Sequence, residues 1–253
     1  KTKAIIPVHL YGQPCDMEKI MDIAKKHNLI VIEDCAEAVG SSINKKLVGT
    51  FGDSSTFSFF GNKTITTGEG GMVLFKDKEK FNKARLLRDH GMNKNKKYWH
   101  EFVGFNYRIT NLQAAVGVAQ MERFEKIISR KQKIFEFYLK NLSNFEGIYK
   151  LPFNSKIFNN SSWLFTVIID PILDREKIIS ELNSIGIQLR PAFFSLSQMP
   201  PYKKYKHSES LENSLFLSRH GVSLPSSAML NKLQLDYILL NFKKVVNKLL
   251  KCK

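Results

Sequence analysis

The stretch that decides the fold is Leu29-Ile30-Val31-Ile32-Glu33-Asp34, a short apolar run that ends in two acids. Such a run is typical of a strand buried inside a parallel sheet. Before it, residues 16–27 carry apolar side chains at helical spacing, and residues 5–10 form another apolar run. Strand, helix and strand in this order predict a βαβ unit with a right-handed crossover, and hence an α/β fold.

Asp34 falls at the carboxyl end of the predicted strand, where open α/β sheets bind their ligands. A buried carboxylate needs a cationic or hydrogen-bonding partner. That partner is either the protonated pyridine nitrogen of a pyridoxal phosphate (PLP) cofactor or a nearby backbone amide. The acid by itself leaves both interpretations open.

Lys63 lies in a second informative stretch, Ser58-Phe59-Phe60-Gly61-Asn62-Lys63-Thr64-Ile65-Thr66-Thr67-Gly68-Glu69-Gly70-Gly71. Strands expected over residues 56–60 and 71–75 flank it, and the glycines predict a tight turn because no helix follows them. An amine among apolar strands loses its proton more easily than one in water. A neutral amine can form a Schiff base with a carbonyl cofactor. Otherwise Lys63 is one solvated loop residue among 39 Lys and Arg.

Six sequence blocks, in order, resemble the DegT/DnrJ/EryC1/StrS aminotransferases, which are PLP enzymes that aminate keto-sugars carried on nucleotides. The blocks are residues 9–14, 32–38, 49–53, 58–71, 87–91 and 104–115. The resemblance implies a fold-type I PLP-dependent transferase of class α/β, with residues 1–125 in the large PLP-binding domain, whose sheet is mostly parallel. Residues 126–253 would then form a small α+β C-terminal domain. Within the family the wording is most similar to enzymes of the perosamine synthetase type.

The family pattern assigns roles to five residues of this sequence. Lys63 matches the Schiff-base lysine and Asp34 the partner of the pyridine nitrogen. Glu37 occupies a position often held by Gln, next to the ring hydroxyl, and Ser58 matches a hydroxyl that binds the cofactor phosphate. Asn106 matches a residue that reaches the cofactor of the neighbouring subunit, which implies a homodimer with shared active sites.

Arg190 opens a segment that resembles the family's substrate entrance. A guanidinium binds phosphate oxygens in a bidentate fork, so Arg190 is either a partner for the nucleotide diphosphate or a surface residue near a strand end. Ser197 stands where many relatives carry a histidine, so the role of that histidine does not transfer. Family members also have a long segment before the equivalent of Lys3, so we expect this chain to be the C-terminal part of a longer enzyme.

Composition limits the remaining classes of protein. Of the 253 residues, 43% are hydrophobic and 25% charged, as in soluble globular proteins. Three scattered cysteines show neither metal-ligand spacing nor a disulfide framework, which favours a reducing cytoplasm and no bound metal. No apolar stretch has the length of a membrane span, so we expect no membrane partner. The net charge of +16 comes from lysines spread along the chain without stacking aromatics, which favours solvated faces over a nucleic-acid site.

Further elements are expected at residues 77–90 (helix), 110–142 (one long helix opened by a capping box), 163–169 (strand), 173–185 (helix), 187–190 (strand) and 233–250 (helix). The strand–helix–strand part, residues 163–190, predicts a second βαβ-like arrangement. The resulting hypothesis is a PLP-dependent aminotransferase that converts a nucleotide-linked 4-keto-6-deoxyhexose to the 4-amino sugar with glutamate as donor. The alternatives are a truncated, inactive remnant that acts as a binding or dimerisation module, and a nucleic-acid-binding protein.

Overall fold

The structure, a computed structural model, describes residues 1–152, 155–205 and 210–251. The chain divides into two compact units. Unit 1 comprises Lys1–Ile128 and Asn154–Trp163, and unit 2 comprises Ser129–Phe153 and Leu164–Lys253. A short segment from the second half of the sequence therefore returns to unit 1.

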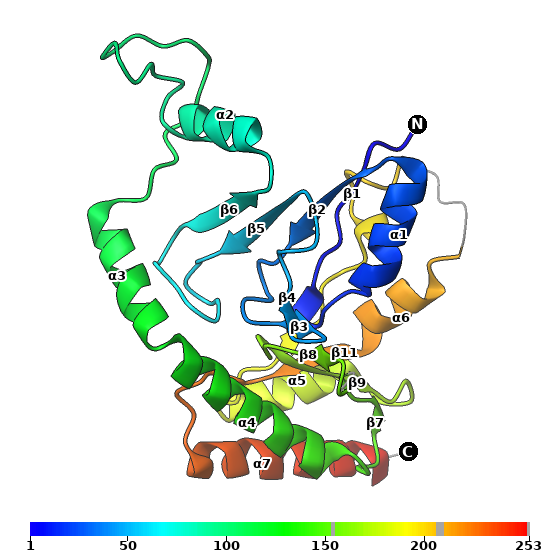
Figure 1. The fold of residues 1–253 in the computed structure, drawn as a ribbon. Helices are drawn as coiled ribbons and strands as arrows, with labels where there is room; N and C mark the ends of the chain where they lie inside the picture. Colours follow the sequence, from blue (N-terminus) through cyan, green and yellow to red (C-terminus); the bar gives the residue numbers. More distant parts are fainter. Residues whose placement is uncertain (153–154, 206–209, 252–253) are drawn as a thin grey trace. The chain divides into compact units, whose positions relative to one another are not determined.

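Unit 1 is built on a four-stranded sheet of order β1-β2-β5-β6 (Figure 1). Its strands are β1 (Ala4–Ile5), β2 (Ile30–Asp34), β5 (Ser54–Ser58) and β6 (Gly71–Phe75). The first three run parallel, and β6 pairs antiparallel with β5. The predicted buried strand is thus confirmed, with β2 in the interior of the sheet.

Helix α1 (Met17–His27) connects β1 to β2, as the sequence predicts. The Asp16 side chain caps it by accepting from the Lys19 amide, and Met17 and Ala24 are buried against Val31 of β2. The prediction of a strand over residues 5–10 is wrong at the carboxyl end of that range. After Ile5 only Val8 bridges to the sheet, and the chain then turns into the 3-10 helix Leu10–Gly12, because Tyr11 and Gly12 adopt positive φ angles of 55° and 87°.

A small second sheet in unit 1 was not predicted. Its strands β3 (Ser42–Ile43), β4 (Lys46–Leu47) and β8 (Phe158–Asn159) are antiparallel, in the order β4-β3-β8. Strand β8 follows β3 by more than a hundred residues in the sequence. Two-residue strands carry no periodicity by which a sequence could reveal them.

The expected single helix over residues 110–142 is two helices, α3 (Asn111–Glu122) and α4 (Phe124–Leu142). Thr110 and Gln113 form the predicted capping box at the start of α3. The break falls at Arg123, whose amide bonds to the carbonyls of Gln120 and Met121 with φ −104° and ψ 6°. The helix predicted over residues 77–90 is α2 (Lys78–Arg88), capped by Asp77.

Unit 2 has a four-stranded antiparallel sheet of order β10-β11-β9-β7. The strands are β7 (Ile148–Lys150), β9 (Phe165–Ile169), β10 (Arg190–Pro191) and β11 (Gly221–Leu224). Because β9 and β10 both run antiparallel to β11, they run parallel to each other with β11 between them. The βαβ-like prediction therefore holds for the strand direction, but the two strands are not neighbours.

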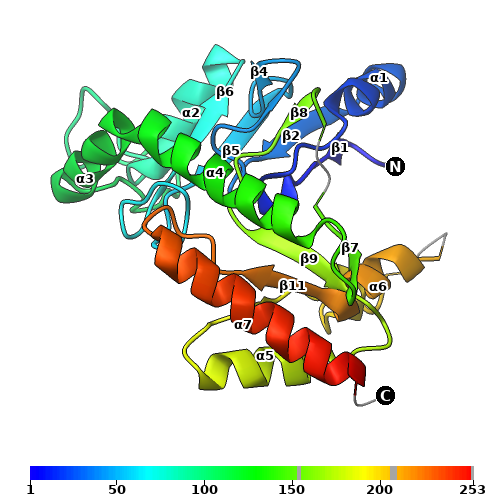
Figure 2. The ribbon, with the colours of Figure 1, turned by 90° about the horizontal axis from the view of Figure 1, so that it is seen from below.

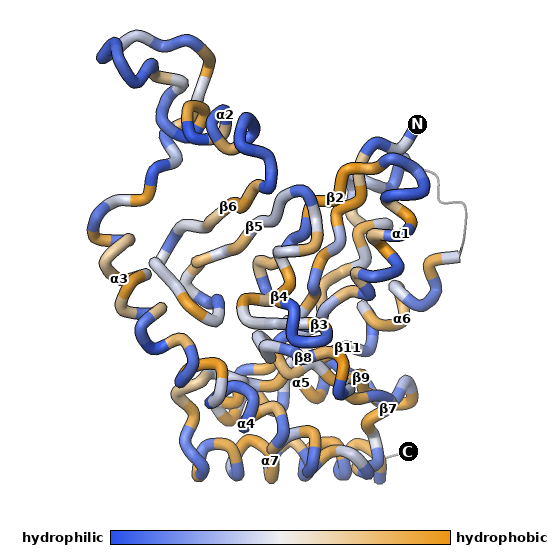
Figure 3. The backbone as a smooth tube through the Cα atoms, in the orientation of Figure 1, coloured by the Kyte–Doolittle hydropathy of each residue, from blue (hydrophilic) through white to orange (hydrophobic). Residues whose placement is uncertain are grey.

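The helices of unit 2 enclose its core. They are α5 (Arg175–Ser184), α6 (Glu212–His220) and α7 (Lys232–Lys251), together with the part of α4 after Ile128 and a 3-10 turn at Leu196–Gln198. Helices α5 and α7 lie side by side (Figure 2), joined by an ion pair of 2.9 Å between Glu181 and Lys248. Hydrophilic and hydrophobic residues alternate along α7 (Figure 3), and its apolar side packs on the same core as Phe165 and Tyr138. Among the helices of the described residues, none is long and apolar enough to cross a membrane.

Candidate active site

Asp34 is the last residue of β2, at the carboxyl end of the parallel strands. Its Oδ1 accepts a hydrogen bond of 3.0 Å from the Ala36 amide. Its backbone is fixed by bonds to Pro7 and His9. Among the described residues no donor contacts the second carboxylate oxygen, Oδ2. One oxygen therefore caps the following turn, as one interpretation of the sequence had it, and the other remains available.

Lys63 lies in the loop between β5 and β6. Two backbone bonds close this loop, from the Phe59 amide to Gly70 and from the Thr67 amide to Phe59. Gly68 and Gly70 adopt positive φ angles, as the predicted tight turn requires. The loop brings Lys63 back toward the carboxyl ends of β2 and β5, and its side chain is only 14% exposed.

The Lys63 amine lies between a carboxylate and an aromatic ring. Its Nζ is 3.6 Å from Glu37 Oε1 and 4.0 Å from the centre of the Trp163 ring. Burial raises the pKa of Glu37, and the nearby Asp34 carboxylate adds to this. The Tyr11 amide and Lys63 act in the opposite direction without cancelling the effect. Glu37 thus lies within electrostatic reach of both Asp34 and Lys63, so the structure brings these three predicted residues together.

Ser58 ends β5, five residues before the lysine, and its hydroxyl accepts a bond of 3.3 Å from the Phe60 amide. Asn106 is an exposed residue elsewhere in unit 1, and its backbone bridges to Asp89. Arg190 belongs to unit 2, where it begins β10 with an exposed side chain. The contacts around Lys63 therefore place Ser58 on the same strand–loop segment but include neither Asn106 nor Arg190.

Two aromatic residues near Lys63 were not predicted as site residues. Tyr11 stacks on Trp163 with ring centres 6.3 Å apart, and its amide donates to Glu37 Oε2 at 2.8 Å. Trp163 was expected only as the start of a strand. Its sequence distance of one hundred residues from Lys63 leaves no local signal by which the contact could be found.

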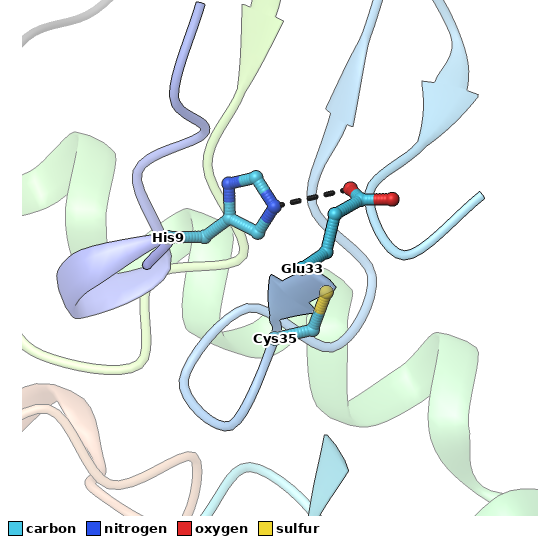
Figure 4. A group of neighbouring side chains, drawn as sticks. All are labelled: His9, Glu33 and Cys35. Carbon is cyan, nitrogen blue, oxygen red and sulfur yellow. Dashed lines mark hydrogen bonds and ion pairs between the residues drawn. The ribbon is translucent and has the colours of Figure 1, made fainter. Parts of the chain in front are cut away.

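Beside this site, His9, Glu33 and Cys35 form a buried cluster (Figure 4). Glu33 accepts from His9 Nε2 at 3.2 Å and from the amides of Gly49, Phe51 and Gly52 at 2.7 Å each. Burial raises the pKa of Glu33, but the bonds from His9 and the three amides outweigh it, so the pKa lies below its usual value.

The ligand atoms of this cluster lie within 4.8 Å of one another, a spacing that a metal ion could bridge. Their hydrogen bonds oppose that use. His9 Nδ1 accepts from the Cys15 amide at 3.1 Å, so the ring hydrogen is on Nε2 and points to Glu33. Burial and neighbouring carboxylates raise the pKa of the Cys35 thiol, which keeps it protonated. The cluster therefore has a structural role: its hydrogen bonds join the strand that ends in Asp34 to neighbouring segments of unit 1.

Comparison with known proteins identifies the fold. The family model of the DegT/DnrJ/EryC1/StrS aminotransferases matches residues 1–243. The chain belongs to this family. GDP-perosamine synthase of Escherichia coli O157:H7 is 45% identical over 239 residues, which are 94% of this chain and 64% of that protein. The enzyme of the same name from Caulobacter vibrioides is 42% identical, over 94% of this chain and 65% of that protein.

A solved structure agrees with this membership. The putative sugar aminotransferase Spr1654 from Streptococcus pneumoniae, in its PLP form, superimposes with a TM-score of 0.88 at 25% identity, covering 98% of this chain and 69% of that one. The predicted α/β fold of a PLP-dependent transferase is thereby confirmed, and PLP is the cofactor of the family. The chain spans slightly less than two thirds of the length of the curated relatives named here.

Proposed function

We propose that this chain carries the lysine-bearing part of the active site of a PLP-dependent aminotransferase that acts on a nucleotide-linked sugar. The observation that carries the proposal is the position of the Lys63 amine, 3.6 Å from Glu37 and at the strand ends where Asp34 keeps one oxygen available. The proposed substrate is a 4-keto-6-deoxyhexose, which becomes the 4-amino sugar with glutamate as donor. The name shared by the two relatives makes a GDP-linked sugar the first substrate to test.

The residues present fit PLP. An amine of low exposure suits attachment to the aldehyde of the cofactor, and Lys63 offers one. The available Oδ2 of Asp34 suits a protonated pyridine nitrogen, since a carboxylate balances that charge. Glu37 Oε2 accepts from the Tyr11 amide and Oε1 forms an ion pair with Lys63, so we assign Glu37 to the lysine; its role at the ring hydroxyl rests on the family pattern.

When bound, PLP supplies an electron sink that stabilises negative charge at the substrate carbon. The residues of this chain do the rest. The Oδ2 of Asp34 would hold a proton on the ring nitrogen. Lys63 Nζ would attach the cofactor and, when free, would carry a proton to and from the reacting carbon. Glu37 would keep Nζ in place for both roles.

The remaining predicted roles rest on the family pattern. Ser58 would donate its hydroxyl to the cofactor phosphate. Asn106 would reach the cofactor of a second copy, so the active form would be a homodimer. Arg190 would bind the nucleotide diphosphate. A cytoplasmic location, expected from the cysteine content, remains a prediction.

The test is to mix the protein with PLP, record the absorbance of the lysine-bound cofactor, reduce with borohydride and map the pyridoxyl group. We expect it on Lys63, and Lys63→Arg should abolish both signals because a guanidinium does not deprotonate. Lys131 is the matched competitor, since it is buried in unit 2 and burial lowers its pKa to about 8. Labelling of Lys131 in preference to Lys63 would end the assignment. Absence of any preferred lysine would favour the non-catalytic module.

A further inference from the structure

Trp163 belongs to a closed circuit of contacts around Lys63. The Lys63 amine lies over the Trp163 ring, which stacks on Tyr11. The Tyr11 amide donates to Glu37, and Glu37 returns to Lys63. Every member of this circuit belongs to unit 1. The amine is thereby held on one side by a carboxylate and on the other by an indole face.

Trp163 is itself fixed at two places. Its indole Nε1 donates a bond of 2.8 Å to the carbonyl of Asn62, the residue next to Lys63. Two residues before it, the Ser161 amide donates to Ser41 Oγ, which in turn donates to the Gly12 carbonyl. Trp163 is only 4% exposed. The indole ring of Trp163 is therefore held in a fixed position against the loop that carries Lys63.

The close approach of these segments explains the glycine at position 12. A Cβ there would lie 2.7 Å from Asn160 Oδ1 and 2.9 Å from Ser161 Oγ, and its φ of +87° also favours glycine. Gly12 thus lets the segment ending in Trp163 pack against the turn that carries Tyr11. The positions of both aromatic rings, Tyr11 and Trp163, depend on this contact.

We propose that Trp163 is a positioning residue for Lys63: its indole face and the Glu37 carboxylate hold the amine in the single orientation from which, once it has lost its proton, it would add to the aldehyde carbon of PLP. A C=N bond would form in that step and the aldehyde oxygen would leave as water. This proposal rests on the proposed function, because positioning matters only if Lys63 is the attachment site. A ring face attracts an ammonium group and excludes water from its side. The indole thus removes alternative rotamers of a flexible four-carbon side chain.

The experiment measures where PLP attaches. The full chain is treated with substoichiometric PLP, reduced with borohydride and digested, and label on Lys63 is expressed relative to label on all other lysines. Trp163→Leu should lower this ratio about five- to tenfold, the size of one aromatic–cation contact. Trp163→Phe, which keeps a ring, should restore most of it.

Trp99→Leu is the matched control. Lys96 lies 3.7 Å from the Trp99 ring centre, and Trp99 is 53% exposed, so this variant removes a similar contact at the surface. It should leave the Lys63 ratio unchanged. Melting curves of all variants show whether Trp163→Leu has disturbed the fold; a lowered ratio supports the positioning role where Trp163→Leu and Trp163→Phe melt at similar temperatures.

The outcomes separate the two proposals. If the unaltered chain shows no preference for Lys63, the proposed function fails. If it prefers Lys63 and Trp163→Leu does so equally, the positioning role is overturned. If Trp163→Leu does not fold, a second measurement uses Trp99→Phe. The chain has two tryptophans, so this variant keeps Trp163 as its only one. PLP should then quench its fluorescence, and Lys63→Met should abolish that quenching; quenching that persists without Lys63 would also overturn the inference.

Discussion

Asp34 uses one carboxylate oxygen for its own chain and leaves the other open. Asp34→Asn should keep the bond from the Ala36 amide, because the amide oxygen also accepts. The neutral asparagine side chain, however, cannot balance a positive charge on the ring nitrogen of PLP. We expect the variant to retain as much PLP as the unaltered chain, while turnover with a GDP-linked keto-sugar falls by about 10²-fold relative to that chain, the cost of removing one preorganised electrostatic partner.

Asp77→Asn is the control for that change. Asp77 caps α2, and aspartate and asparagine cap helices about equally well, so this variant should behave as the unaltered protein. Absorbance measures retention of PLP, and product formation measures turnover. Near-normal turnover of Asp34→Asn would show that Asp34 only caps its turn.

Glu37 predicts a stability that depends on pH. Burial holds its pKa above the ordinary value of 4.5, so the fold favours the protonated carboxyl. The corresponding stability is present below about pH 4.5 and is lost as the pH rises through the raised pKa. Gln resembles the neutral carboxyl and does not titrate. The melting temperature of Glu37→Gln, relative to that of the unaltered chain, should therefore rise as the pH increases above 4.5.

Exposed Glu146 offers the comparison: the pH trend of Glu37→Gln is measured relative to that of Glu146→Gln. Thermal melts between about pH 4 and pH 8 measure both variants. A constant difference for Glu37→Gln would show that Glu37 is equally charged in the folded and unfolded chains.

The sequence was informative about residues whose chemistry is tied to a local pattern. Asp34 follows an apolar strand, and Lys63 lies in a glycine-rich loop between two strands, so both positions could be predicted. Trp163 could not, because its partner is set by how segment 154–163 returns to unit 1. Contacts between distant segments depend on packing, for which one sequence holds no periodic signal.

At the scale of elements, Glu33 joins three parts of unit 1. It links the end of β2 to the amides of Gly49, Phe51 and Gly52 and to His9 of the first turn. Glu33→Gln leaves a single acceptor oxygen and places an NH₂ group against N–H donors. Breaking such a buried network should lower the free energy of unfolding by about 3 kcal/mol.

The pH dependence gives a second measurement on the same residue. The pKa of Glu33 is lowered, so its stability contribution is present above about pH 4.5 and is lost as the pH falls below that value. The loss caused by Glu33→Gln, measured by urea unfolding, should shrink in acid, opposite in sign to the trend of Glu37. A loss that stays the same at every pH would show that the Glu33 charge contributes nothing.

Helices and strands long enough to show a repeating pattern of hydrophobic residues could be predicted from the sequence. Strands of two residues could not. Helices α1 and α7 and strand β9 carry that period over five or more residues. No glycine or proline marks the break between α3 and α4 in the sequence. There, Phe124 and Ile128 pack onto Gly40, whose missing Cβ would lie 3.0 Å from the Phe124 ring. Tertiary packing, not propensity, sets this boundary.

At the scale of the whole molecule, unit 1 exposes a group of apolar side chains on β6 and α3. Exposed apolar side chains line β6 and α3, and an apolar pocket of about 520 Å³ lies between these elements. Contiguous patches of this kind are typical of surfaces that pack against other protein. The exposed residues are Met72, Val73, Leu112, Val118 and Met121, each at least half exposed.

We therefore predict that this 253-residue chain self-associates and retains PLP weakly by itself. Replacing Leu112 and Val118, 82% and 60% exposed, by Glu should reduce association in sedimentation velocity without lowering the melting temperature, because neither side chain is buried. Joining the part of the 45% identical relative that lies outside the matched region should improve both solubility and PLP retention. Leu233→Glu, on an 80% exposed position of unit 2, is the control and should change neither property. A well-behaved dimer of the unaltered chain that binds PLP tightly would contradict this prediction, since its apolar faces would then need no further cover.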